Sequence, residues 1–147
     1  MKKWIYVPIV ILFFTSVILG VMLYHSIQEQ KQLQNHIVSN FSHSVYFLIH
    51  DTEDVLEGVV NWDRRKYVIF ECLVKLDVLA QLGSDMNTGY FRKMTYGIED
   101  GPQQFGRFLD DWKQLYDELQ RNERMNRDDF NEIIKRFDKL EEKLVGR

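Results

Sequence analysis

The chain begins with an unbroken apolar segment. After Lys2 and Lys3, no charged residue occurs from Trp4 to Tyr24, and aromatic residues stand near both ends of this run. A helix needs about 20 apolar residues to cross the hydrocarbon of a bilayer, and aromatic rings are favoured at the two interfaces. The pattern therefore predicts a single transmembrane helix over residues 4–24.

A cleaved signal peptide is the alternative for this segment. The apolar run is longer than the roughly 7–15 residues of a signal-peptide core, and no small-x-small cleavage site follows it. The lysines before the run place the N-terminus in the cytoplasm by the positive-inside rule. We expect a single-pass signal anchor in the cell membrane, with residues 1–3 as a cytoplasmic tail and residues 25–147 as an extracytoplasmic domain.

Residues 26–60 carry apolar side chains at alternating spacings of three and four, which is typical of a helix with one buried face. No proline or glycine separates this segment from the apolar run. We expect one continuous helix from Trp4 to about Val60. The predicted buried face comprises Ile37, Phe41, Val45, Leu48, Thr52, Val55 and Val59.

A second helix is predicted from Trp62 to Leu82, with Asn61 as its N-cap and Gly83 as its stop. Its apolar residues lie almost all round the helix, a pattern typical of a helix in the middle of a bundle. Cys72 falls on the apolar side and is expected to be an inert core thiol.

Residues 83–106 are rich in glycine and are predicted to be largely irregular, with a short helix near residues 86–96. Long structured loops in compact domains are often functional. Two interpretations stay open: a connector whose aromatic residues cap the end of the core, or a binding surface. The candidate binding residues are Tyr90, Phe91, Arg92, Tyr96, Glu99 and Asp100.

Two amphipathic stretches, residues 103–124 and 127–145, complete the chain. Their apolar stripes are in phase, so one long helix is possible, but Asn126 can cap a new helix and acidic residues follow it. We predict a hairpin. The fold class expected is all-α: a transmembrane helix that continues into an extracytoplasmic antiparallel bundle of about four helices.

Composition excludes several classes of function. The chain has 19 basic and 22 acidic residues and no basic stripe, which argues against nucleic-acid binding. Its single cysteine excludes an internal disulfide and a thiolate zinc cluster. No catalytic motif for hydrolysis, redox chemistry or nucleotide binding occurs. We therefore expect a protein that is not an enzyme and has no cofactor and no metal.

Three histidines, His36, His43 and His50, recur every seven residues and share the polar side of the first helix with His25. Neighbours seven apart lie about 10 Å apart along the axis, whereas zinc–nitrogen distances are about 2 Å, so one ion cannot bridge them. We interpret them as a solvated face, with a pH response as the alternative.

Two aromatic residues, Tyr46 and Phe47, lie beside these histidines and are candidates for contact with a partner. Together with the missing catalytic motifs, they favour a membrane-anchored interaction module. Such a module would act as an adaptor, assembly factor or inhibitor on another membrane or envelope protein, or would self-associate. The alternative is an extracytoplasmic ligand or pH sensor that uses the 83–106 loop or the histidines.

Overall fold

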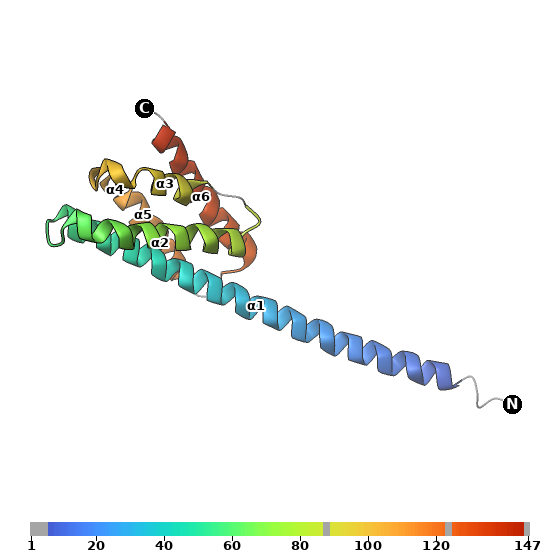
Figure 1. The fold of residues 1–147 in the computed structure, drawn as a ribbon. Helices are drawn as coiled ribbons and strands as arrows, with labels where there is room; N and C mark the ends of the chain where they lie inside the picture. Colours follow the sequence, from blue (N-terminus) through green and yellow to red (C-terminus); the bar gives the residue numbers. More distant parts are fainter. Residues whose placement is uncertain (1–5, 87–88, 123–124, 146–147) are drawn as a thin grey trace. The chain divides into compact units, whose positions relative to one another are not determined.

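A computed structural model describes residues 6–86, 89–122 and 125–145 (Figure 1). Over these ranges the chain is all-helical, as the sequence predicted, and it divides into two units, Met1–Leu33 and Gln34–Arg147. The elements are α1 (Tyr6–Leu56), α2 (Trp62–Gly83), α3 (Tyr90–Tyr96), a 3-10 turn η2 (Ile98–Asp100), α4 (Gln103–Gly106), α5 (Leu109–Arg121) and α6 (Arg127–Val145).

The first unit consists of the N-terminal part of α1, whose apolar side chains from Leu12 to Tyr24 are exposed. Among the described residues, α1 is the one helix long and apolar enough to cross a membrane, a property that signal sequences share. The expected continuity of the apolar run with the following helix is confirmed from Tyr6 onward. Residues 1–3 and Trp4 lie outside the described residues.

Helix α1 ends at Leu56 and does not reach Val60 as expected. Gly58 adopts a left-handed φ of 74°, and the amides of Val59 and Val60 then donate to the carbonyl of Asp54 at 2.8 and 3.1 Å. Glycine reaches this conformation without steric cost, so it stops the helix. The assignment of Val59 to the buried face is wrong, because the chain has already turned and this side chain is exposed.

The part of α1 in the second unit runs beside α2 (Figure 1). Three contacts connect the helices: Gln34 Nε2 donates to the Gly83 carbonyl at 3.1 Å, the Cys72 thiol donates to the Ser44 carbonyl at 3.0 Å, and Arg65 pairs with Asp51 at 2.6 Å. The partner number in α2 falls as the α1 number rises. The two helices therefore run antiparallel.

Helix α2 starts at the predicted cap, where the Asn61 side chain accepts a hydrogen bond from the Asp63 amide at 2.8 Å. Its predicted burial on all sides is wrong. The inner face is buried against α1, α3 and α6, but the opposite face is exposed, because α2 has neighbours on one side only. We call this exposed apolar surface the α2 outer face; it comprises Tyr67, Phe70, Val74, Val78 and Leu82.

The segment 83–106 is more regular than predicted, since it contains α3, η2 and α4. Tyr90 and Phe91 are fully buried, and the Trp112 indole N–H donates to the Tyr90 hydroxyl at 2.9 Å. These two aromatic side chains therefore belong to the core. The single helix expected over 103–124 is divided into α4 and α5, with the buried ring of Phe108 at the junction.

Separate helices α5 and α6 confirm the choice of two helices over one long one. The Asn126 side chain accepts from the Asp129 amide at 2.9 Å, and the Asp129 carboxylate accepts from the Asn126 amide at 3.2 Å. This reciprocal capping box fixes the start of α6. Met125 is buried beside this cap and extends the core.

Phe41 lies at the centre of the core of the second unit and is fully buried. Its ring packs edge-on against Phe91 of α3 at 5.7 Å and against Phe130 and Phe137 of α6 at 5.1 and 5.7 Å between centroids. Edge-to-face pairs at this distance add stabilisation beyond the area that they bury. One side chain of α1 therefore connects three helices.

We predict that Phe41→Ala destabilises the second unit by about 3–5 kcal/mol, because a large cavity replaces a ring that touches three others. Phe47→Ala on the same helix should cost less than about 1 kcal/mol, since its ring is half exposed. Chemical denaturation of the full chain in detergent, followed by circular dichroism, measures both. Equal losses for the two variants would contradict the central place of Phe41.

Candidate functional site

The candidates in the 83–106 segment do not come together as one site. Tyr90 and Phe91 are buried in the core, and burial raises the pKa of Tyr90. Arg92 pairs with Asp77 of α2 at 3.1 Å. The remaining three, Tyr96, Glu99 and Asp100, are exposed.

Glu99 is engaged with Lys66 of α2 at 3.4 Å, a contact that raises the pKa of the lysine through a hydrogen bond and charge attraction. A second ion pair between this segment and α2 joins Arg92 to the partly buried carboxylate of Asp77. These pairs tie the 83–106 segment to α2. The buried rings and these ion pairs are what the connector interpretation expects, whereas Tyr96 and Asp100 remain exposed.

The histidines of α1 lie on its exposed side, in agreement with the predicted polar face. His43 packs edge-on against Phe47, with 4.6 Å between ring centroids. His50 Nδ1 lies 3.3 Å from Asp54 Oδ2, the pairing expected at a spacing of four. His43 and His50 thus each have a local side-chain partner.

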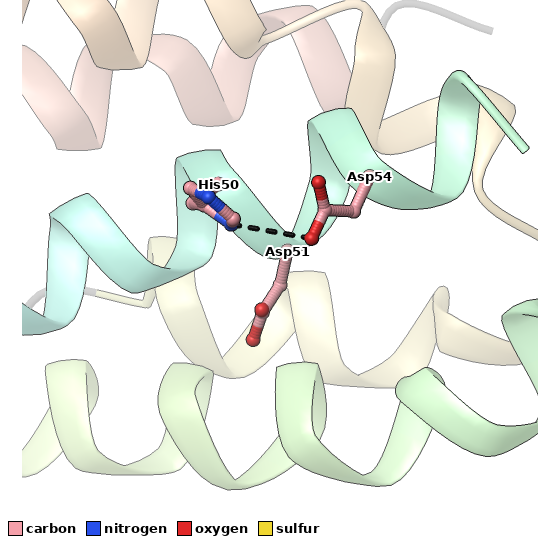
Figure 2. A group of neighbouring side chains, drawn as sticks. All are labelled: His50, Asp51 and Asp54. Carbon is pink, nitrogen blue, oxygen red and sulfur yellow. Dashed lines mark ion pairs between the residues drawn. The ribbon is translucent and has the colours of Figure 1, made fainter. Parts of the chain in front are cut away.

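His50, Asp51 and Asp54 place three metal-binding atoms within 4.8 Å of one another. Figure 2 shows that His50 and Asp54 face each other, whereas the Asp51 carboxylate points away from this pair. Asp51 is buried and its carboxylate is held by Arg65 at 2.6 Å. A cation bound by all three residues would have to displace a guanidinium that already neutralises the buried charge. The cluster is explained by two separate ion pairs.

A set of aromatic rings covers the exposed side of α1 and reaches α5. Tyr46 contacts Phe47 at 5.8 Å, His50 at 6.0 Å and Tyr116 at 5.8 Å between ring centroids. Tyr46 and Phe47, the predicted partner contacts, are each nearly half exposed. We call this surface the aromatic patch; it comprises His43, Tyr46, Phe47, His50 and Tyr116.

Beside the aromatic patch, α1 and α5 border a groove of about 440 Å³. Its apolar lining residues, Val38, Leu119 and Met125, are buried. The other described lining residues are polar, and none of the described lining residues is aspartate, glutamate, lysine or arginine. We call it the amide groove; the wall residues used below are Asn35, Ser39, Asn40, His43, Tyr116 and Gln120.

Sequence reasoning missed the amide groove, although a signal was present. No charged residue occurs between Lys31 and Asp51, in a chain of which 28% is charged. The exposed positions of this stretch are mainly asparagine, serine, glutamine and histidine. This exposed helix face therefore carries neutral polar and aromatic side chains over several turns.

The α2 outer face has a different chemistry. Its five members are between 42 and 67% exposed and carry no charge. Glu71 and Lys75, one of each sign, are exposed beside it. The face is an apolar strip with a mixed-charge border.

Cys72 is the only cysteine, and it lies on the inner side of α2, where its thiol donates to the Ser44 carbonyl. Burial raises the pKa of this thiol to about 12. The thiolate is the nucleophilic form of cysteine, so Cys72 is protonated and unreactive at neutral pH.

Known proteins offer no guide to these surfaces. No protein-family model, no curated protein and no solved structure matches the chain. The α2 outer face, the aromatic patch and the amide groove are therefore compared below by their own chemistry.

We predict that iodoacetamide at pH 8.5 modifies Cys72 at least about 100-fold more slowly in the folded chain than after unfolding. The raised pKa of about 12 keeps the folded thiol protonated, whereas an ordinary thiol with a pKa near 8.5 is half ionised. Mass spectrometry of the full chain, with and without denaturant, measures both rates. Similar rates would show that the thiol is accessible and ionised in the folded protein.

Proposed function

We propose that the chain is a membrane-anchored, non-enzymatic interaction module. Its second unit forms a largely antiparallel helical bundle outside the cytoplasm and docks on another membrane or envelope protein as an adaptor, assembly factor or inhibitor. The observation that carries this proposal is the exposed α2 outer face.

The extent of the α2 outer face supports docking. From Tyr67 to Leu82 it extends about 22 Å along the helix at 1.5 Å per residue. All five of its side chains are large and apolar, and they follow one another on one side of the helix. Exposed apolar surfaces of this continuity mark sites of contact with proteins or membranes more often than they occur as ordinary solvent-facing surface.

The spacing and the charges favour a helix of another protein as the occupant. Apolar residues at intervals of three and four form a ridge that packs into the groove of a second helix. A helix that lies on anionic lipid carries lysine and arginine along its polar border. Glu71 and Lys75 give the border both signs, which suits a protein partner with complementary charges.

Anchoring in the membrane would allow one helix face to be a sufficient binding interface. The apolar part of α1 and the two lysines before it support a span with a cytoplasmic N-terminus. A partner in the same membrane would meet the second unit at a high effective concentration, so a modest interface would be occupied. A partner of this kind is the membrane or envelope protein of the proposal.

A sensor function has weaker support. Two of its predicted ligand contacts, Tyr90 and Phe91, are in the core. The His50 side chain is about half exposed in its pair with Asp54, and exposed ion pairs contribute at most about 1 kcal/mol. The interaction module is therefore the better proposal.

We predict that a photo-crosslinking residue at Val74 forms a specific adduct with one membrane or envelope protein in intact cells. The same residue at Gln114, exposed on α5, is the matched control and should give no such adduct. Val74→Lys with Val78→Lys should reduce recovery of the partner about 100-fold, since two buried valines contribute at least about 3 kcal/mol. Gel shift and mass spectrometry identify the adduct.

An adduct between two copies of the chain would replace docking on a foreign partner by self-association. Adducts of equal yield at Val74 and Gln114, or none at Val74, would show that the α2 outer face is not an interface. Circular dichroism of the double lysine variant verifies that it remains folded, as expected for substitutions at exposed positions.

We predict that alkaline phosphatase fused after residue 147 is active and that green fluorescent protein fused there is dark. The phosphatase folds only outside the cytoplasm, and the lysines before the apolar run orient the chain outward. After residue 3, the phosphatase fusion should be inactive and the green fluorescent protein fusion fluorescent, as expected for the cytoplasm. A fluorescent C-terminal fusion would reverse the proposed orientation.

A further inference from the structure

We infer that the amide groove, with the adjoining aromatic patch, is a binding site for a neutral polyhydroxylated ligand, such as a segment of an oligosaccharide. This site lies on α1 and α5 and does not involve the α2 outer face. It therefore goes beyond the proposed docking function and can be tested separately.

The hydrogen-bonding groups of the walls match hydroxyl groups. The side-chain amides of Asn35, Asn40 and Gln120 each carry donors and an acceptor, and the hydroxyl of Ser39 does both. A sugar hydroxyl likewise donates and accepts. The described lining residues carry no carboxylate, ammonium or guanidinium group.

The aromatic patch provides apolar contacts for the faces of sugar rings. A pyranose has an apolar face of C–H groups, which packs on exposed rings. Tyr116 lines the groove and lies 5.8 Å from Tyr46, so rings continue from the groove onto the surface of α1. A volume of about 440 Å³ is within the 300–1,000 Å³ typical of small-molecule sites.

The two walls are held in place by direct contacts. Gln120 Nε2 donates to the Ser42 hydroxyl at 2.7 Å, which connects α5 to α1 inside the groove. Asn40 Nδ2 donates to the His36 carbonyl at 2.9 Å, which fixes the orientation of its amide. Walls that are positioned before binding lose less entropy when a ligand is bound.

A neutral peptide is the competing ligand class. Peptide grooves offer apolar pockets for side chains or an open sheet edge for main-chain pairing. The amide groove lies between helices, its exposed lining residues are polar, and its apolar lining residues are buried. These features favour hydroxyl groups over peptide side chains, and the experiment includes a peptide for comparison.

The test uses the full chain in lipid nanodiscs free of sugar-based detergent. Calorimetric titrations use three probes of different linkage, cellohexaose, maltohexaose and chitohexaose, and an uncharged capped hexapeptide of asparagine, glutamine and serine. We expect one or more of the oligosaccharides to bind. Asn35→Ala and Gln120→Ala should each weaken that binding at least tenfold, whereas Gln114→Ala, exposed on α5 outside the groove, should leave it unchanged.

Two variants serve as controls, one for misfolding and one for independence from the docking proposal. Asn35 is exposed, so loss of binding in Asn35→Ala with an unchanged melting temperature assigns the effect to the groove. Val74→Lys on the α2 outer face should retain full oligosaccharide binding, which separates this inference from the docking proposal. Absence of binding by all three oligosaccharides, equal binding by the groove variants, or binding of the peptide alone would overturn the inference.

Discussion

The buried ring of Phe41 is the contact on which the second unit depends. It meets rings from α3 and α6, and these helices in turn pack against α2. Since α1 supplies the ring, α3 and α6 are placed relative to the segment of α1 between Gln34 and Leu56. The buried pair of Asp51 with Arg65 fixes the neighbouring α2 in register, because a buried carboxylate without its partner would be strongly destabilising. Aromatic packing therefore holds the helices together at the centre of the unit, and one ion pair fixes the position of α2 along α1.

This arrangement determines which surfaces remain available. The inner face of α2 is occupied by α1, α3 and α6, and none of the described helices covers the opposite side. Six large apolar side chains of α2 consequently stay exposed, the five of the α2 outer face and Val68. On the other side of the unit, α5 packs along α1 and leaves its polar residues beside the uncharged stretch of α1. The unit thus presents one apolar and one neutral polar surface, formed by different helices.

The sequence was sufficient for the class of fold and for most helix boundaries. The all-α class, the long first helix, the Asn61 cap and the break before α6 follow from local signals: periodicity, a capping residue and a capping box. Local signals failed where tertiary neighbours decide the outcome. The pattern of α2 cannot distinguish a helix covered on all sides from one with an exposed apolar face, and the glycine-rich segment looked irregular although Tyr90 and Phe91 anchor α3 in the core. The amide groove depends on α5 facing α1, and residues more than 70 positions apart give no periodic signal.

The uncharged stretch between Lys31 and Asp51 connects these observations. A surface helix normally carries lysine and glutamate on the face opposite its buried face, and these residues keep it soluble at little energetic cost. Here the buried face holds Phe41, Val45 and Leu48, as stability requires, but stability places no demand on the exposed face. Exposed asparagine and serine are poorer helix formers than lysine or glutamate, so they reduce the stability of α1 slightly. Asn35, Ser39 and Asn40 among them line the amide groove, where they offer the hydrogen-bonding groups that the proposed polyhydroxylated ligand would use.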